Sequence, residues 1–260
     1  MFERGKGRGM RVFAKYLVIA CVVGSSGYVL LARPDSSATV TVRVEIVHPA
    51  SGHKAATANA AADASNVAVW LTPVGEVSAA SNASSRPQPQ IAQNHKSFDP
   101  HVLVVRVGTA VQFPNRDPFL HNVFSLFDGK RFDLGFYEAG SSKTVHFDKV
   151  GVSFLFCNIH PEMSGAVIAV DTPYFGLSDH SGRVSIPDVP NGRYQLGVWD
   201  ERSLPEELKN LSRAVTVSET VKNLELIRIV ENPNFTLEHK NKYGQEYVPP
   251  ASANPIYGAP

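Results

Sequence analysis

The chain has 260 residues, of which 43% are hydrophobic and 19% charged, and its formal net charge is +1. This hydrophobic share supports a packed core and excludes a wholly disordered chain, while the small net charge excludes the electrostatic footprint of a nucleic-acid-binding protein. Two cysteines are too few for a fold held by disulfides. The 19 glycines and 18 prolines suit a turn-rich β protein.

Residues 1–32 have the pattern of a secretory signal. The first 15 residues hold five basic side chains and one acidic side chain, and a mostly apolar run follows from Tyr16 to Ala32. A basic start, an apolar run and small residues near a cleavage point are the parts of a signal peptide. The run is short for a membrane-spanning helix. We therefore expect a periplasmic or otherwise extracytoplasmic protein, with an uncleaved N-terminal membrane anchor as the alternative.

The next part of the chain alternates between strand-like and turn-rich segments. Period-two alternation of apolar residues predicts strands within residues 38–75. Residues 78–90 are rich in Ser, Ala and Pro, which predicts a flexible connection or an exposed loop. From residue 91 to residue 171, short apolar segments are separated by Gly, Pro, Asn and Asp. This pattern is typical of an antiparallel β-sandwich.

The C-terminal part predicts further strands and then an irregular end. Apolar segments within residues 172–230 are separated by turn sequences, with a short helix expected within residues 205–212. Residues 231–260 are rich in Asn, Pro and Tyr and have no periodicity. We expect this tail to be extended or disordered. The chain as a whole is predicted to be all-β.

A short loop after one predicted strand carries three potential metal ligands. Cys157, His160 and Met163 have the spacing C-x-x-H-x-x-M, and another strand is expected from about Gly165. Thiolate, imidazole and thioether together suit copper in both oxidation states. Cys157 would be the one cysteine left after removal of a signal. A free thiol in an oxidising compartment is exposed to oxidation unless it is buried or bound to a metal.

A fourth ligand is expected from His121, at the start of another predicted strand. Two His and one Cys in a plane, with a weak axial Met, form a blue-copper site. The alternative is structural, with Cys157 and Met163 in the core and His121 as a buried histidine with satisfied hydrogen bonds. The other histidines have no ligand spacing, and we interpret them as surface or loop residues: His48, His53, His95, His101, His146, His180 and His239.

Residues 102–171 resemble the cupredoxin family, with the amicyanin and plastocyanin branch most similar. The resemblance lies in FPNRD followed by HNVFS, in the strand and loop FCNIHPEM, and in the exit strand GAVIAV. It implies a Greek-key β-sandwich in which Asn122 ties the His121 strand to the ligand loop. It also implies one type 1 copper centre with these ligands: His121, Cys157, His160 and Met163.

The flanking segments carry a second resemblance. TVTVRVEIVHPASG and NVAVWLTP look like the opening of a carboxypeptidase-regulatory-like (transthyretin-like) β domain, and SDHSGRVSIPDVPNGRYQLGVWDE looks like its closing half. We expect residues 38–82 and 173–230 to form one smaller β-sandwich, with a cupredoxin domain of residues 87–172 inserted into it. Residues 38–82 supply about two strands, which alone are marginal in water. Separate N- and C-terminal β pieces are the alternative.

The resemblance to cupredoxins implies an electron carrier without substrate turnover. A dinuclear copper centre would need two bridging cysteines, and a trinuclear cluster would need His-x-His pairs, which the sequence lacks. Four protein ligands leave no open position for a substrate, so single-electron transfer between redox partners is the expected function. A partner would dock near His160, which we expect to lie nearest the surface. Copper carriage or buffering is the alternative, and a structural module without copper is a third hypothesis.

Overall fold

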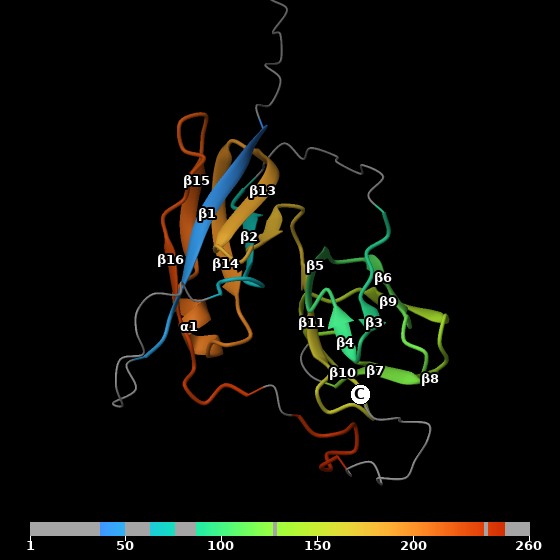
Figure 1. Ribbon diagram of the computed structural model, residues 1–260. Coiled ribbons are helices and arrows are strands. Elements are labelled where there is room, and N and C mark those ends of the chain that lie inside the picture. The colour runs from blue at the N-terminus through green and yellow to red at the C-terminus, as the bar shows by residue number, and fades with distance from the viewer. Residues whose placement is uncertain (1–36, 50–62, 76–86, 127–128, 237–238, 248–260) are drawn as a thin grey trace, which may run out of the picture. The chain divides into compact units, whose positions relative to one another are not determined.

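The computed structural model describes residues 37–49, 63–75, 87–126, 129–236 and 239–247 (Figure 1). Within these residues the protein is all-β apart from one short helix, as the sequence predicts. The expected signal or anchor, residues 1–32, lies outside the described residues, as does most of the expected flexible connection. In the described parts, no helix is long and apolar enough to cross a membrane.

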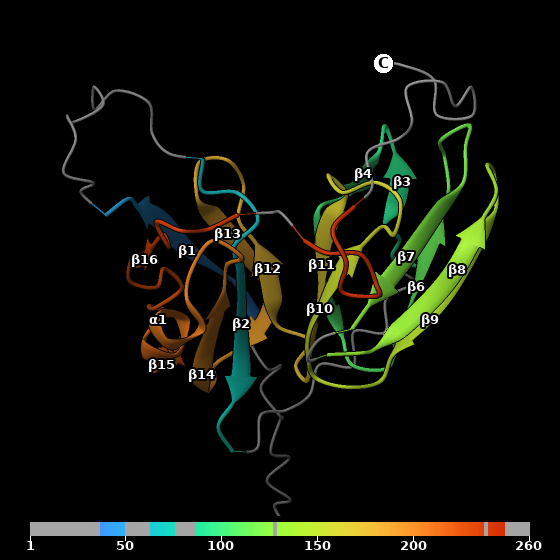
Figure 2. The ribbon, with the colours of Figure 1, turned by 90° about the horizontal axis from the view of Figure 1, so that it is seen from below.

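The central part of the chain contains nine strands and carries the candidate site (Figures 1 and 2). The strands are β3 (Ala92–Asn94), β4 (Ser97–Asp99), β5 (Val102–Arg106), β6 (Thr109–Pro114), β7 (His121–Ser125), β8 (Phe132–Tyr137), β9 (Ser142–Phe147), β10 (Gly151–Phe156) and β11 (Ser164–Val170). A five-stranded sheet has the order β5-β11-β10-β7-β8, and β6 pairs with β9 while β3 pairs with β4. Phe113, Phe147 and Leu155 are among the fully buried residues of the core of this part.

The five-stranded sheet is mixed, whereas the sequence pattern predicted an antiparallel arrangement. Strand β11 runs antiparallel to β10 and parallel to β5. A parallel pair needs a long connection between its strands, and here the connection contains β6 to β10. The alternation of apolar residues identifies strands but does not determine their direction, so it could not distinguish these two arrangements.

Strand β11 is buried on both faces, which explains its continuous apolar sequence GAVIAV. Val167 and Ala169 belong to the core of the central part. Ala166 and Ile168 belong to a second core, which includes residues of the flanking segments. Successive side chains of a strand point to opposite faces, so one strand contributes to both cores.

The flanking segments form sheets together. Their elements are β1 (Ser37–Val47), β2 (Ala68–Pro73), β12 (Phe175–Leu177), β13 (Arg183–Pro190), β14 (Gly192–Trp199), α1 (Pro205–Asn210), β15 (Arg213–Val217) and β16 (Ile227–Val230). One sheet has the order β13-β1-β16 and the other has the order β12-β2-β14-β15. Each sheet therefore joins a strand that precedes the central part to strands that follow it. The likeness to a transthyretin-like domain, and residues 87–172 as an inserted domain, stay predictions.

Gly182, which directly precedes β13, lies against the backbone of β1, so replacing it tests the contact between the two flanks. Gly182 has a φ of +76°, and a Cβ atom there would overlap the backbone oxygen of Val44 in β1. We expect Gly182→Ala to lower the free energy of unfolding by about 2–5 kcal/mol, because left-handed strain adds to a backbone collision. Gly108→Ala is the matched control, because Gly108 has a φ of +91° but a Cβ atom added there would meet no atom within 4 Å. If urea unfolding shows that both full-length variants lose the same free energy of unfolding, the close contact between Gly182 and Val44 is contradicted.

Candidate metal centre

Three neighbouring strands bring the candidate ligands together. His121 is the first residue of β7, and Cys157 directly follows β10. Strand β10 pairs with β7 and with β11, so the start of β7 lies near the loop between β10 and β11. This loop carries His160 and Met163. It is tightened by backbone hydrogen bonds from the Met163 N–H to the His160 oxygen (3.1 Å) and from the Cys157 N–H to the Met163 oxygen (3.4 Å).

The ligand atoms of His121, Cys157 and His160 converge at one buried point. Cys157 Sγ lies 3.8 Å from His121 Nδ1 and 3.5 Å from His160 Nδ1. The two Nδ1 atoms are 3.1 Å apart. Within the described residues, no other group of three or more His, Cys, Asp and Glu side chains has its ligand atoms this close together. Cys157 and His121 are fully buried, and His160 is 5% exposed.

The ring of His121 is oriented by a buried carboxylate. His121 Nε2 lies 2.7 Å from an oxygen of Asp117, which is itself 5% exposed. An ionised carboxylate only accepts hydrogen bonds, so the proton of His121 belongs on Nε2. The lone pair of Nδ1 is then directed at Cys157 and His160. A metal-ligating histidine often has its other ring nitrogen bound to a carboxylate in this way.

The electrostatics of the site keep both imidazoles neutral. Burial, together with the nearby ring of His121, lowers the pKa of His160 to about 4. Burial also lowers the pKa of His121, although Asp117 opposes the change. Burial raises the pKa of Cys157, against the backbone N–H groups of Asn122, Ile159 and His160. The Nδ1 atoms of His121 and His160 therefore face a thiol that would become a thiolate only beside a compensating positive charge.

Met163 is the fourth ligand residue predicted from the sequence. It is fully buried, belongs to the same core as Cys157 and lies in the loop that carries Cys157 and His160. Its role as a ligand stays a prediction. Asn122 differs from the expectation, because its side-chain amide donates to Asp133 in β8 at 2.7 Å. It is the backbone N–H of Asn122 that faces the Cys157 sulfur.

The spacing of the three atoms fits a single metal ion. Metal–nitrogen bonds of about 2.05 Å and a metal–sulfur bond of about 2.3 Å would require ligand–ligand separations of about 3.4–3.8 Å, between tetrahedral and trigonal geometry. The two nitrogen–sulfur separations, 3.5 and 3.8 Å, lie in this range. The nitrogen–nitrogen separation of 3.1 Å is shorter and would correspond to an N–metal–N angle of about 100°. Soft thiolate and thioether donors with two imidazoles fit copper, and two His with one Cys and a weak Met are typical of electron-transfer sites. The residues present therefore fit the group implied by the sequence.

Sequence reasoning missed Asp117, although it lies four positions before His121. Its carboxylate also accepts hydrogen bonds from the backbone N–H groups of His95 (2.7 Å) and Lys96 (2.9 Å), in the turn between β3 and β4. Burial raises the pKa of Asp117, but these N–H groups and His121 together bring it below its usual value. The sequence contains no signal for this role, because the turn that holds the carboxylate is more than 20 residues away.

His53 lies outside the described residues, and the other six histidines are not part of the cluster. His101 is half-buried, and its Nε2 lies 2.8 Å from the carboxylate of Glu201, which raises the pKa of His101.

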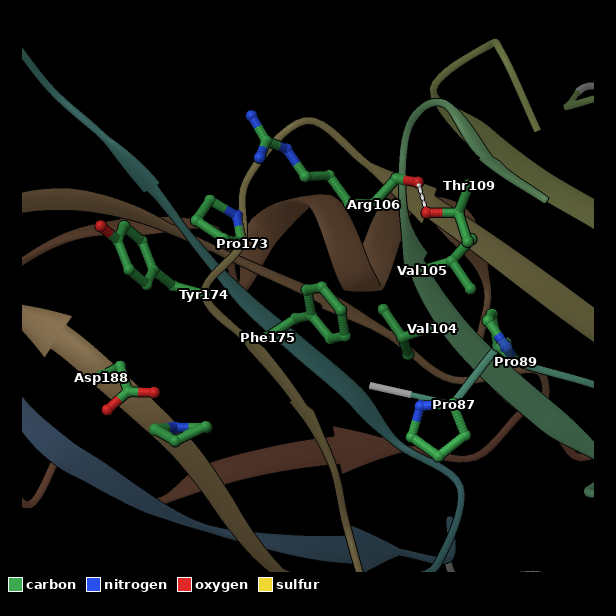
Figure 3. A pocket seen from close by; sticks show the side chains of 11 residues that line it. Pro87, Pro89, Val104, Val105, Arg106, Thr109, Pro173, Tyr174, Phe175 and Asp188 are labelled. Carbon is green, nitrogen blue, oxygen red and sulfur yellow. Dashed lines mark hydrogen bonds between the residues drawn. The ribbon is translucent and has the colours of Figure 1, made fainter. Parts of the chain in front are cut away.

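A separate pocket of about 290 Å³ shares no residue with the cluster (Figure 3). Its lining includes Val104, Arg106, Tyr174 and Phe175. None of the four candidate ligand residues lines this pocket.

The chain matches no family model and no curated protein sequence. Solved structures similar to part of it include a copper-containing nitrite reductase from Thermus scotoductus, with 25% identity over 37% of this chain and 25% of that chain and a TM-score of 0.32. A purple cupredoxin from Nitrosopumilus maritimus has 26% identity over 32% of this chain and 99% of that chain, with a TM-score of 0.29. A reduced amicyanin mutant has 21% identity over 34% of this chain and 88% of that chain, with a TM-score of 0.31. The case for a metal rests on the residues of the site itself.

The hydrogen bond between Asp117 and His121 gives a prediction for metal affinity. We expect Asp117→Asn to weaken copper binding about 10- to 100-fold, because a carboxylate holding the second nitrogen of a ligand histidine fixes the ring and increases its basicity. Competition with a chelator measures the affinity of the full-length protein. Asp148→Asn is the matched control, because Asp148 is an exposed carboxylate paired with Lys130. Equal affinities of the two variants would show that Asp117 does not support the site.

Proposed function

We propose that this protein is an exported type 1 (blue) copper protein that carries single electrons between redox partners. The proposal rests on one observation, the convergence of His121 Nδ1, Cys157 Sγ and His160 Nδ1 at a buried point beside Met163. The donor set supports copper because its sulfur ligands are soft and its imidazoles suit both oxidation states. We propose one copper centre with these four ligands.

Bound copper would supply reversible one-electron chemistry, and the chain supplies a dry and rigid surrounding. His121 is held by Asp117, and the ligand loop is held by its own backbone hydrogen bonds. Both restraints favour the same side-chain positions in the two oxidation states, so little has to move when an electron is transferred. Because four protein side chains fill the proposed coordination sphere, we propose an electron carrier without substrate turnover.

The proposed entry point for electrons is the edge of His160. This is the most exposed of the four proposed ligands, although only 5% of it is accessible. The ring of Phe119 lies 5.6 Å from the ring of His160, and the neighbouring Leu120 is 41% exposed. An apolar surface beside a ligand edge suits brief docking of a redox partner. Export, to the periplasm or another extracytoplasmic space with or without an N-terminal anchor, is proposed from the sequence alone.

Replacing the sulfur ligand tests the copper assignment. We expect the copper-loaded protein to show an intense visible band, because a thiolate bound to oxidised copper absorbs by charge transfer, and we expect Cys157→Ser to abolish it. The measurement is a visible spectrum at one equivalent of copper. Cys21→Ser is the matched control and should keep the colour. A blue Cys157→Ser variant would overturn the assignment.

The axial position gives a second test, by electrochemistry. We expect Met163→Gln to retain copper and to lower the reduction potential, because a harder oxygen donor favours the oxidised ion, while Met163→Leu should raise it. If neither substitution moves the potential, Met163 is not a ligand. Rapid electron self-exchange of the wild-type protein supports a carrier of electrons. Ready transfer of copper to an apo acceptor would instead favour the alternative function, copper carriage or buffering.

A further inference from the structure

The C-terminal segment His239–Tyr247 contacts the candidate metal centre although it lies outside the central part of the sequence. We call this segment the strap. It folds on itself, with the Asn241 side chain accepting hydrogen bonds from the N–H groups of Tyr243 (2.9 Å) and Gln245 (3.0 Å). A compact segment of this kind can hold its side chains in fixed positions, although the sequence has no periodicity here.

One end of the strap reaches the cysteine ligand. The hydroxyl of Tyr247 donates a hydrogen bond to the backbone oxygen of Cys157 at 2.6 Å. The same hydroxyl lies 3.1 Å from Nδ1 of His239, whose ring packs on Phe156 with the ring centroids 4.2 Å apart. Phe156 is the last residue of β10. The strap thus contacts both the strand that leads into the cysteine and the carbonyl group of the cysteine.

The middle of the strap contacts the ligand loop and, through Asp133 in β8, the strand that carries His121. The backbone N–H of Lys242 donates to the side-chain oxygen of Asn158 at 3.0 Å, directly after Cys157. The ammonium group of Lys242 lies 2.7 Å from Asp133, the same carboxylate that accepts from the side chain of Asn122. Asn122 is adjacent to His121 in β7. Lys242 therefore connects the ligand loop to the His121 strand through three polar contacts, two of its own and the one between Asp133 and Asn122.

We propose that the strap is a structural part of the metal centre, with Tyr247 and Lys242 acting as positioning residues for the ligand loop. This inference builds on the proposed copper function. The strap contacts the loop on both sides of His160: at Phe156, Cys157 and Asn158, and through the ring of His239 at the backbone of Pro161 and Met163. A donor proton near the cysteine ligand also favours the more electron-rich, reduced state of the centre. Loss of the strap contacts should therefore loosen the loop and lower the reduction potential.

The first test needs no metal. In a full-length Cys21→Ser background, Cys157 is the single thiol, and its rate of reaction with an aromatic disulfide reagent reports opening of the loop. We expect Tyr247→Phe to raise this rate about three- to tenfold, as expected for one lost hydrogen bond. Tyr243→Phe is the matched control, because Tyr243 is in the same strap and 71% exposed. Equal rates for the two variants would overturn the proposal.

Lys242 provides an independent pair of variants. We expect Lys242→Met to raise the thiol reaction rate and Lys242→Arg to restore most of the protection, because arginine can also pair with Asp133. Lys240→Met is the control, since Lys240 pairs with Glu246 in an exposed ion pair. If Lys242→Met and Lys240→Met behave alike while unfolding midpoints are unchanged, the strap does not restrain the loop through Lys242, and the proposal fails at this contact.

The second test uses the copper-loaded protein and separates the two proposals. We expect Tyr247→Phe to lower the reduction potential and to speed release of copper to a chelator, while Tyr243→Phe leaves both unchanged. Unchanged values for Tyr247→Phe would overturn the role of the strap and leave the copper function intact. A wild-type protein that binds no copper, but whose thiol reactivity still depends on Tyr247, would overturn the proposed function and support the strap.

Discussion

The candidate metal centre depends on three potential ligand atoms that the fold brings together at one buried point. Two neutral imidazoles direct nitrogen atoms at each other and at a thiol inside a buried site, with the two nitrogens 3.1 Å apart. Buried polar groups are costly unless they are paired, and in a low-dielectric surrounding the cost grows. The rest of the fold must therefore hold these side chains in place. A bound cation would replace the polar contacts among these three atoms with coordination, and a soft sulfur donor beside two imidazoles is the physical reason to propose a metal here.

The scaffold that holds the ligands extends beyond the central part of the chain. Strand β11 follows the ligand loop and contributes alternate residues to two cores, one of which contains residues from both flanks. Fixing β11 from both faces limits movement of the loop that ends at Ser164. Backbone geometry at a metal site needs such support, because small displacements of the ligands change affinity and potential. The flanking segments thus support the candidate metal centre by packing against β11. This support does not depend on whether the central part can fold by itself.

The sequence indicated the cluster of His121, Cys157 and His160 more directly than it indicated the side chains that support it. Cys157, His160 and Met163 lie within one loop, so their spacing alone shows that they can converge, and the apolar alternation identifies the strands on both sides. Asp117 and Tyr247 were missed because their partners depend on tertiary structure, and a lone Asp or Tyr has no recognisable spacing. Strand direction was missed for the same reason, since it follows from topology.

The turn between β3 and β4 shows how this support is built. His95 and Lys96 both have a φ of 53°, which is uncommon for residues with a side chain. This conformation is energetically unfavourable, but it aims two consecutive N–H groups at the carboxylate of Asp117. The carboxylate is also fixed from its own segment, because the Asp117 N–H donates to the side chain of Asn115 at 3.0 Å. Held on both sides, Asp117 fixes the ring of His121, so local backbone strain far along the sequence contributes to the direction of one proposed copper ligand.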